Sequence, residues 1–287
     1  MKILKFFTCA MILVALASCQ KHEITYNTRE LDNTDAEFQL HYFEPVQRSA
    51  SAYYIDSVFV NGILYSSVNG SGQLASYNAV PGGSAGRFFA VKAGEVKFTF
   101  WRGGAVVYEN KATLVGGKKQ NVFVYDMTKA PVVIENDFPY ELDRPAATAK
   151  DWGTDSVASV RFYNFMYEEP GVPYPGKLQY QWRNDVKDAS GEYVWHNVGE
   201  PVGFGQASTR AMLIVHKTAV VSQGSQAIYY RILTEDGSIL QTVNSSGKMT
   251  NYSDYWTATI GRAMTHIWAG IRTSSNPYAY VSQWYNK

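Results

Sequence analysis

The chain has 287 residues, enough for one large domain or two domains of ordinary size. Hydrophobic residues make up 46% of the sequence and charged residues 18%, so a substantial core can form and general disorder is excluded. The aromatic content of 15% favours strands over helices. Because 26 Lys and Arg residues face 25 Asp and Glu residues, the net charge is +1, and no nucleic acid is predicted as a partner.

The first 19 residues have the organisation of an export signal. Lys2 and Lys5 form a positive region, and residues 6–16 form an apolar stretch too short to span a bilayer comfortably. The stretch closes on the motif Leu-Ala-Ser-Cys, which ends at Cys19. This motif resembles the lipobox of bacterial lipoproteins, which implies cleavage before Cys19, diacylation of its thiol and acylation of the new amino group. A plain secretory signal that contains a cysteine is the alternative.

The lipobox resemblance carries a prediction of location. Removal of Lys2 and Lys5 changes the net charge from +1 to −1, and lipid on Cys19 leaves no thiol for a disulfide or a metal site. Gln20 follows the cysteine in place of the Asp that resembles an inner-membrane retention signal, so an outer membrane is implied. Residues 20–23 are similar to the short charged export tags of Bacteroidota surface lipoproteins, which implies exposure at the cell surface.

Strand signals separated by turn signals run through the first half. Residues 54–60 and 63–65 flank Asn61-Gly62, a pair that favours the type I′ turn of a hairpin. Further strands are predicted at residues 36–42, 87–92, 97–101, 105–108 and 120–125. Glycine pairs punctuate these strands and helix-length apolar periodicity is absent, which predicts a sandwich or a barrel.

The second half repeats features of the first. Residues 36–45 resemble residues 160–170, since both alternate and then end in an acidic residue and a proline. Further counterparts pair 54–60 with 177–182, 97–108 with 228–240, and 120–125 with 266–271. The offset grows from about 124 to about 144 residues, so the second copy is predicted to carry insertions.

These features together resemble the tandem Ig-like β-sandwich lipoproteins of Bacteroidota, many of which have no known function. The resemblance implies an all-β fold of two Ig-like (Greek-key) sandwiches and a role in binding, adhesion or scaffolding, and it supplies no functional residues. The predicted parts are a signal peptide at 1–18, a lipidated tether at 19–35, a first sandwich at 36–138, a linker at 139–155 and a second sandwich at 156–287.

A search for catalytic and metal-binding motifs excludes most of the candidate sites. The five histidines are scattered without metal-ligand spacing, and no Ser, His and acid are placed so as to suggest a catalytic triad. Residues 171–178 match most of a phosphate loop, but two prolines remove backbone donors and Leu178 replaces the required hydroxyl. Residues 32–37 offer oxygens for Ca²⁺ but lack the EF-hand loop, so a solvated tether is favoured. We predict no enzyme, no cofactor and no metal site.

The aromatic residues fall into two groups. Alternating strand positions predict core positions for Phe38, Phe59, Phe98, Phe100 and Phe162. The second group lies in or beside polar loops: Tyr174, Tyr180, Trp182, Tyr193, Trp195, Tyr252, Tyr255, Trp256, Tyr278, Tyr280, Trp284 and Tyr285. Nearby polar partners are Asn184, Asp185, Asn251, Asp254, Asn276 and Gln283. Such rings either cover sandwich edges or stack on sugar rings while the amides and carboxylates bind sugar hydroxyls.

The favoured function is a non-enzymatic, surface-anchored protein that binds a polysaccharide or an envelope protein through sandwich-end loops. For a glycan site we predict that Trp182 and Trp195 are exposed rings on either side of Asn184 and Asp185. Asp56-Ser57-Val58 and Asp155-Ser156-Val157 resemble the short Asp-Ser/Thr-apolar tag for O-glycosylation in Bacteroidota. The resemblance implies O-glycosylation at Ser156, which lies at the end of the predicted linker, in preference to Ser57 in a predicted strand.

The alternative is a fimbrial or pilus subunit or anchor. Such subunits resemble this plan and assemble by strand donation, which implies processing of the leader at an arginine. Arg29 is the only arginine before the first predicted strand, so it is the candidate cut site.

Overall fold

The structure is a computed structural model. It describes residues 32–44, 55–67, 85–86, 88–137, 157–215, 220–222 and 225–286. The chain divides into Met1–Leu31 and one compact unit, Asp32–Lys287, which contains all of these residues. The described residues form strands, turns and loops without a helix, which confirms the all-β prediction. None of them forms a helix with the length and hydropathy of a membrane span.

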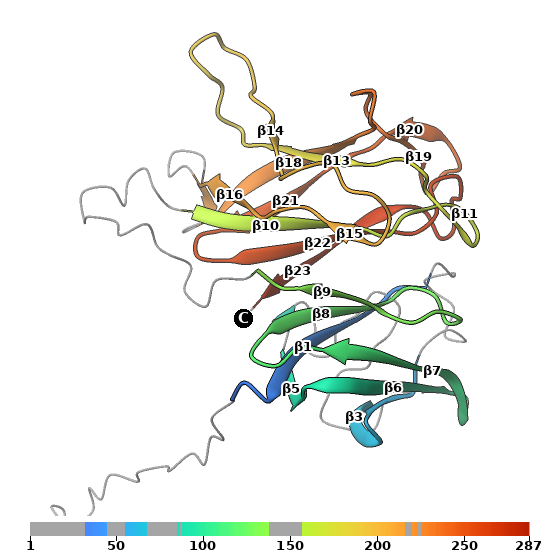
Figure 1. Cartoon of the computed structure of the whole chain (residues 1–287). Coiled ribbons are helices and arrows are strands. Elements are labelled where there is room, and N and C mark those ends of the chain that lie inside the picture. Colours follow the sequence, from blue (N-terminus) through green and yellow to red (C-terminus); the bar gives the residue numbers. More distant parts are fainter. Residues whose placement is uncertain are drawn as a thin grey trace, which may run out of the picture. The chain divides into compact units, whose positions relative to one another are not determined.

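Two four-stranded sheets form the first half (Figure 1). One has the order β5-β1-β8-β9, with β1 (Asp35–Tyr42), β5 (Phe89–Lys92), β8 (Lys119–Val124) and β9 (Val132–Glu135). The other has the order β3-β2-β6-β7, with β2 (Ser57–Val60), β3 (Ile63–Ser67), β6 (Gly94–Arg102) and β7 (Ala105–Leu114). Neighbouring strands are antiparallel except β1 and β8, which run parallel.

Alternation along β1 places one set of side chains in a core shared by these two sheets. Phe38, Leu40 and Tyr42 are buried there. Phe38 meets Phe98 of β6 edge to face with ring centroids 5.7 Å apart, and Tyr42 meets Phe100 at 5.8 Å. The two sheets therefore pack face to face as a sandwich.

The predicted hairpin of β2 and β3 is present, and it corrects one expected core residue. Asn61 and Gly62 have φ angles of 51° and 78°, the positive values that a type I′ turn needs. Phe59, predicted to be core, lies half-buried on the opposite face, 6.4 Å from the Trp101 ring. Its neighbour Val58 points inward instead. Side chains alternate between the two faces of a strand, so a shift of one residue decides whether Val58 or Phe59 enters the core.

The second half contains two larger sheets and two short strand pairs. One sheet has the order β15-β10-β22-β23-β4, with β16 also paired to β10. Its strands are β4 (Ala85–Gly86), β10 (Val157–Asn164), β15 (Gln206–Ala207), β16 (Ala211–Ile214), β22 (Ala263–Ala269) and β23 (Tyr280–Asn286). The other has the order β14-β13-β18-β17, with β21 also paired to β18. Its strands are β13 (Gln179–Arg183), β14 (His196–Asn197), β17 (Val220–Ser222), β18 (Ser225–Leu233) and β21 (Ser253–Thr259).

The short pairs and the second core complete this half. The pairs are β11 (Tyr167–Glu169) with β12 (Val172–Pro173), and β19 (Gln241–Val243) with β20 (Met249–Asn251). In the core, Tyr180 of β13 stacks on Tyr230 of β18 with ring centroids 5.0 Å apart, and its hydroxyl lies 2.9 Å from His266 Nδ1. Phe162, predicted to be core, is fully buried among them.

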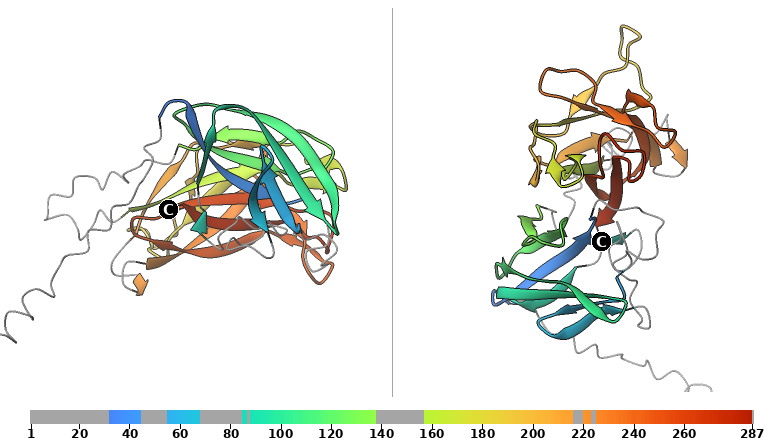
Figure 2. Two further views of the ribbon diagram at one scale, coloured as in Figure 1. Left: turned by 90° about the horizontal axis from the view of Figure 1, so that it is seen from below. Right: turned by 90° about the vertical axis from the view of Figure 1, so that its right-hand side faces the viewer.

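The two halves, traced by colour in Figure 2, share a strand plan. The parallel pair β10–β22 repeats the parallel pair β1–β8. Strands β13, β18 and β21 are ordered as β2, β6 and β7 are. The predicted counterpart of 105–108 at 239–240 pairs antiparallel with the end of β18, through Ile239 with Leu233 and Leu240 with Ile232. Beyond it the β19–β20 hairpin is inserted, and β21 then pairs with the rest of β18.

The outward faces of the β1 sheet and the β10 sheet share a third apolar cluster. Phe43 and Phe123 come from the first half, and Tyr163, Phe165 and Ile267 come from the second. The Phe123 ring lies 5.1 Å from that of Tyr163 and 4.8 Å from that of Phe165. These side chains bury apolar surface from both halves in one interface.

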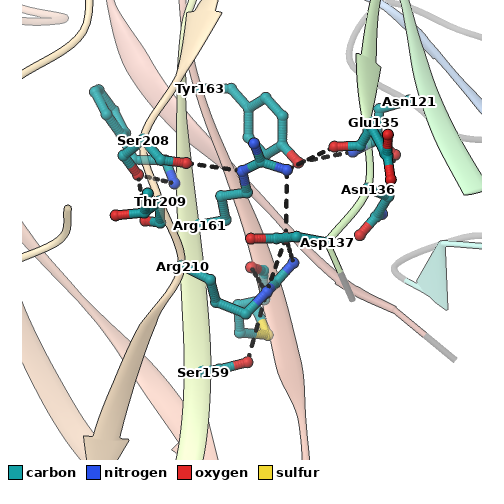
Figure 3. Close-up of polar contacts among 12 residues, drawn as sticks. Asn121, Glu135, Asn136, Asp137, Ser159, Arg161, Tyr163, Ser208, Thr209 and Arg210 are labelled. Carbon is teal, nitrogen blue, oxygen red and sulfur yellow. Dashed lines mark hydrogen bonds and ion pairs between the residues drawn. The ribbon is translucent and has the colours of Figure 1, made fainter. Parts of the chain in front are cut away.

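Polar contacts frame this interface (Figure 3). The Asp137 carboxylate after β9 lies 3.3 Å from Arg161 Nη1 and 2.9 Å from Arg210 Nη2. Asn121 of β8 donates from Nδ2 to the Tyr163 hydroxyl at 2.8 Å. The halves are therefore joined by ion pairs and a hydrogen bond as well as by the apolar cluster.

Several predicted boundaries lie outside the described residues. The linker at 139–155 and the signal peptide are among them, and the division into two domains stays a prediction. One boundary can be checked. The predicted tether of residues 19–35 includes Asp35, but this residue begins β1, is buried and pairs with Lys92 at 3.0 Å. The short β4 from the first half pairs with β23 of the second.

Candidate functional site

A cleft of about 700 Å³ opens in the second half between the β19–β20 hairpin, the start of β21 and the strand β23. Its lining comprises residues 242–245, 250–254 and 278–284. Four aromatic residues contribute: Tyr252, Tyr278, Tyr280 and Trp284. Amide and carboxylate side chains come from Asn244, Asn251, Asp254 and Gln283. The cleft therefore brings together aromatic residues from two separate segments, around Tyr252 and around Tyr278, that the sequence predicts to lie in or beside polar loops.

A chain of hydrogen bonds runs along one wall of the cleft. The backbone N–H of Val281 donates to the Tyr252 hydroxyl at 3.3 Å. The hydroxyls of Tyr252 and Tyr230 lie 3.2 Å apart, and Tyr230 donates to Asp254 Oδ2 at 3.3 Å. Because the Tyr230 proton goes to Asp254, the Tyr252 proton is the one shared between the two phenols.

Burial keeps these two phenols protonated. Desolvation raises the pKa of Tyr230 well above its ordinary value of 10.0, and the neighbouring Tyr252 and Asp254 add to the shift. Desolvation also raises the pKa of Tyr252, and the Asp254 charge acts in the same direction. Both hydroxyls are therefore neutral donors at physiological pH, and the chain ends at a carboxylate that can accept further hydrogen bonds.

The β19–β20 hairpin that forms one side of the cleft is held at its turn. Asn244 Oδ1 accepts from Ser246 N at 3.0 Å and Lys248 N at 3.1 Å, and Gly247 supplies a φ of 80°. Such side-chain caps of a turn fix its backbone locally.

An ion pair supports the same hairpin from the opposite side. The Arg272 guanidinium donates from Nε to Glu168 Oε2 at 2.6 Å and from Nη1 to the Gln241 carbonyl at 3.1 Å. The backbone N–H of Val243 donates to the Arg272 carbonyl at 2.9 Å. The hydrogen bonds to Glu168 raise the pKa of Arg272 above its ordinary value, so its charge is permanent.

The aromatic side of the cleft comes from the segment that leads into β23. The rings of Tyr278 and Tyr280 meet edge to face with centroids 5.8 Å apart. Tyr280 is 8% exposed, whereas Tyr278 is half-buried and keeps part of its ring open to solvent. The Tyr252 ring packs edge to face against Trp268, with ring centroids 4.3 Å apart. Rings fixed by such packing present a preformed surface to a ligand.

The predicted glycan pair, Trp182 and Trp195, is divided between two environments. Trp182 is 6% exposed and belongs to the second core, with its ring 4.7 Å from His196, so the expectation of an exposed ring is wrong. The alternation of Tyr180 and Trp182 with Gln181 and Arg183 is the sequence signal that places both rings inside. Trp195 is half-buried on the outward face of the sheet.

The two polar residues predicted beside this pair lie at the surface. Asn184 Oδ1 accepts from Val186 N at 3.0 Å, and the exposed Asp185 pairs with Arg183 at 3.3 Å. Their contact with a partner stays a prediction. Cys19, Arg29 and Ser156 lie outside the described residues.

The segments considered for phosphate and metal ions have other roles. Residues 171–178 include β12 and a turn with Gly171 at a φ of 76°, and they end in the buried Leu178. Asp32 caps the turn before β1 through Thr34, whose N–H and hydroxyl both donate to Oδ1. In the part of the chain that the structure describes, no three acidic, His or Cys side chains are grouped to hold a metal ion.

Comparisons with known proteins give no family. No protein-family profile and no curated protein matches the chain. Among solved structures, a leucine-rich repeat protein from Bacteroides thetaiotaomicron is 11% identical, and the match covers 83% of this chain and 26% of that one with a TM-score of 0.19. The TIE protein of Bacillus anthracis is 7% identical, over 82% of this chain and 33% of that one, with a TM-score of 0.21.

A third solved structure is of similar length. It is a candidate cell adhesion protein from Parabacteroides distasonis, 9% identical, and the match covers 88% of this chain and 98% of that one with a TM-score of 0.20. Similarities of this size establish neither a shared fold nor a shared function.

Proposed function

We propose that the protein is a non-enzymatic, surface-anchored binding protein whose cleft holds a neutral saccharide. The observation that carries this proposal is the union of aromatic rings and hydrogen-bonding side chains around a cleft of about 700 Å³. That volume suits a ligand of a few sugar rings, since small-molecule sites span about 300–1,000 Å³. A sugar ring has an apolar face and a rim of hydroxyls, and the cleft offers partners for both.

The polar side chains leave hydrogen-bonding capacity for such a ligand. Asp254 accepts from Tyr230 through Oδ2 and from the backbone of Tyr255 through Oδ1, and each oxygen retains a further lone pair. Asn251 Oδ1 accepts from Gln241 at 3.1 Å, so its amide nitrogen is the group that can donate to a sugar hydroxyl. Asp254 and Asn251 are both exposed at the mouth of the cleft.

The proposal includes the anchor. Cys19 and the motif before it support lipid attachment, and several acyl chains at about 0.8 kcal/mol per buried methylene hold a protein stably on a membrane. The sequence after Cys19 supports an outer membrane with exposure at the cell surface. Tandem Ig-like sandwiches, the finer fold proposed here, are supported by the repeated strand plan of the two halves.

A glycan array with the purified protein tests the cleft. Tyr278→Ala removes a half-buried ring that lines it, and at least about tenfold weaker binding of the selected neutral glycan is expected, the loss of an aromatic anchor. Trp101→Ala is the matched control, because Trp101 is also a half-buried ring and does not line the cleft. Absence of any glycan ligand, or equal losses for the two variants, contradicts the proposal.

Fractionation tests the anchor. Cys19→Ala is expected to release the protein from membranes, because the lipid then has no attachment site. Membrane pelleting of the Cys19→Ala variant after a high-salt wash contradicts the anchor and leaves the cleft proposal untouched.

A further inference from the structure

The outward face of the sheet β14-β13-β18-β21 carries a second cluster that the cleft does not use. We define it as the arginine–aromatic face: Arg183, Tyr193, Trp195, Tyr229, Arg231 and Tyr255. These side chains come from three strands and from the connection between β13 and β14, which extends from the sheet in yellow in Figure 1. None of the six lines the cleft.

Strand register explains why these side chains gather. Arg183 of β13 is opposite Tyr229 of β18, which is opposite Tyr255 of β21. Two residues along the strands, Gln181 is opposite Arg231. Because residues two apart share a face, both rows point outward while Tyr180 and Trp182 point into the core.

The cations lie directly over the rings. The Arg183 guanidinium is 4.0 Å from the Tyr193 ring centroid and 4.3 Å from that of Tyr229. The Arg231 guanidinium is 4.2 Å from the centroid of Trp195. Such contacts hold both guanidinium groups against aromatic rings on this face.

Arg231 differs from Arg183 in its charge balance. Arg183 has the Asp185 carboxylate at 3.3 Å, whereas among the described residues no carboxylate pairs with Arg231. Arg231 donates from Nε to Gln181 Oε1 at 2.9 Å, and Gln181 in turn donates to Asn197 at 2.8 Å. This relay orients the guanidinium and leaves its terminal nitrogens for an incoming group.

The surroundings of Arg231 favour an anion over a neutral ligand. Partial burial lowers the pKa of Arg231 below its ordinary value through desolvation, so an anion that pairs with it recovers electrostatic stabilisation. Tyr255 is 60% exposed and Tyr193 is 41% exposed, so flat apolar surface remains open beside the cation. Aromatic planes next to an uncompensated guanidinium match a ring that carries an acidic group.

We propose that the arginine–aromatic face binds acidic polysaccharide, with the carboxylate or sulfate of a sugar at Arg231 and a sugar ring on the exposed Tyr255. The guanidinium offers two parallel N–H donors to the acidic group, and the Tyr255 ring takes the apolar face of the sugar. This site lies on a different face from the cleft and does not rest on the function proposed above.

Binding of oligogalacturonate by the purified protein, measured by calorimetry, tests the site. Methyl-esterified oligogalacturonate has the same rings without charge, and at least about tenfold weaker binding is expected for it. Dextran sulfate with dextran forms the second pair of probes, which separates sulfate from carboxylate recognition. Polyglutamate supplies carboxylates without sugar rings, and equal affinity for it would overturn the stacking half of the proposal.

Variants locate the site. Arg231→Gln is expected to weaken oligogalacturonate binding at least about tenfold, and Arg231→Lys to an intermediate degree, since Lys keeps the charge without the planar fork. Lys177→Gln removes an exposed cation elsewhere, and a change below about twofold is expected. Tyr278→Ala in the cleft leaves acidic-sugar binding intact. Losses for Lys177→Gln as large as for Arg231→Gln would overturn the proposal, as would unchanged binding by Arg231→Gln in a protein with unaltered melting temperature.

Discussion

The two halves share a strand plan and differ in the connections between strands. In the first half, Asn61-Gly62 alone joins β2 to β3, and Gly103-Gly104 joins β6 to β7. In the second half, residues 184–195 join β13 to β14, and residues 234–252 with the β19–β20 hairpin join β18 to β21. The second half has therefore kept the strands and lengthened the same two connections.

Both proposed sites use these lengthened connections. The β19–β20 hairpin forms one side of the cleft, and the β13–β14 connection supplies Tyr193 and Trp195 to the arginine–aromatic face. The corresponding turns of the first half are too short to add a side chain to any neighbouring surface. In this molecule the repeated strands supply rigidity, and the insertions supply chemistry, as expected for loops on a stable scaffold.

The largest expected effect comes from comparing two tryptophans, Trp182 on strand β13 and Trp195 in the inserted connection that follows it. Trp182→Ala is expected to destabilise the fold by about 3–5 kcal/mol, because it leaves a large cavity in the second core. Trp195→Ala, on the outward face, is expected to cost less than about 1 kcal/mol. Urea denaturation of both variants measures the difference. Similar losses would show that the inserted connection is as much a part of the core as the strand.

Among the residues that the structure describes, each half has one buried histidine on a strand. Desolvation lowers the pKa of His41 from 6.5 to about 3, against the raising effect of a hydrogen bond to Asn121, and desolvation alone lowers the pKa of His266 to about 3 as well. In the unfolded chain both titrate near 6.5, so between pH 6.5 and about 3 unfolding takes up protons. The stabilisation is complete above pH 6.5 and is lost as the pH falls, by up to about 1.4 kcal/mol per pH unit for each histidine.

Denaturant unfolding between pH 7 and pH 4 measures this slope for the protein and for single variants. His41→Gln and His266→Gln are each expected to flatten the slope by one histidine's share. His196→Gln is the control, because its side chain is exposed. A slope that responds to His266→Gln alone would show that acid acts on the second half only.

A smaller effect concerns the interface that joins the halves. Asp137 pairs with Arg161 and Arg210, whose side chains are only 13% and 7% exposed. Asp137→Ala is expected to cost about 1–2 kcal/mol, less than a fully buried pair because the carboxylate itself is partly solvated. Asp185→Ala, which removes an exposed partner of Arg183, serves as the control with a loss below about 0.5 kcal/mol.

Limited proteolysis examines the same interface without mutation. Cleavage is predicted within residues 139–155, and the two fragments are expected to remain associated through the Phe123 cluster and the Asp137 ion pairs. Size-exclusion chromatography of the cut protein measures this. Fragments that elute separately would show two independent sandwiches.

Local signals in the sequence predicted the strands and turns well. Period-two alternation and the Asn61-Gly62 turn are properties of a few adjacent residues, and both are present in the structure. It is harder to predict which of the two alternating sets of side chains on a strand points into the core, because that depends on which face meets the other sheet. Phe59 and Trp182 were assigned to the wrong side for this reason.

The candidate sites depend on contacts between distant segments. Tyr252, Asp254 and Tyr278 were recognised as residues able to bind sugars, but only the pairing of β18 with β21 and the position of β23 bring them around one cleft. Likewise Arg231 gains its role from Trp195, 36 positions earlier, through the stack over that ring. A single sequence carries no signal for such pairings.

The smallest expected effects on stability come from glycine substitutions in the turns of the two halves. Gly62 and Gly191 have φ angles of 78° and 85°, and at each an added Cβ would meet open space, so only backbone strain separates glycine from alanine. Gly62→Ala is expected to cost about 1 kcal/mol of global stability, because the two-residue turn has no freedom to relax and both its strands border the first core. Gly191→Ala strains a tip far from its sheet, held by hydrogen bonds to Asp188, and that tip can open locally without unfolding the strands. Its cost is expected below about 0.5 kcal/mol in denaturant unfolding, while amide exchange at Glu192 accelerates. Equal global costs for the two substitutions would mean that the inserted connection folds as one cooperative unit with the strands, and the division between rigid strands and adaptable insertions would fail.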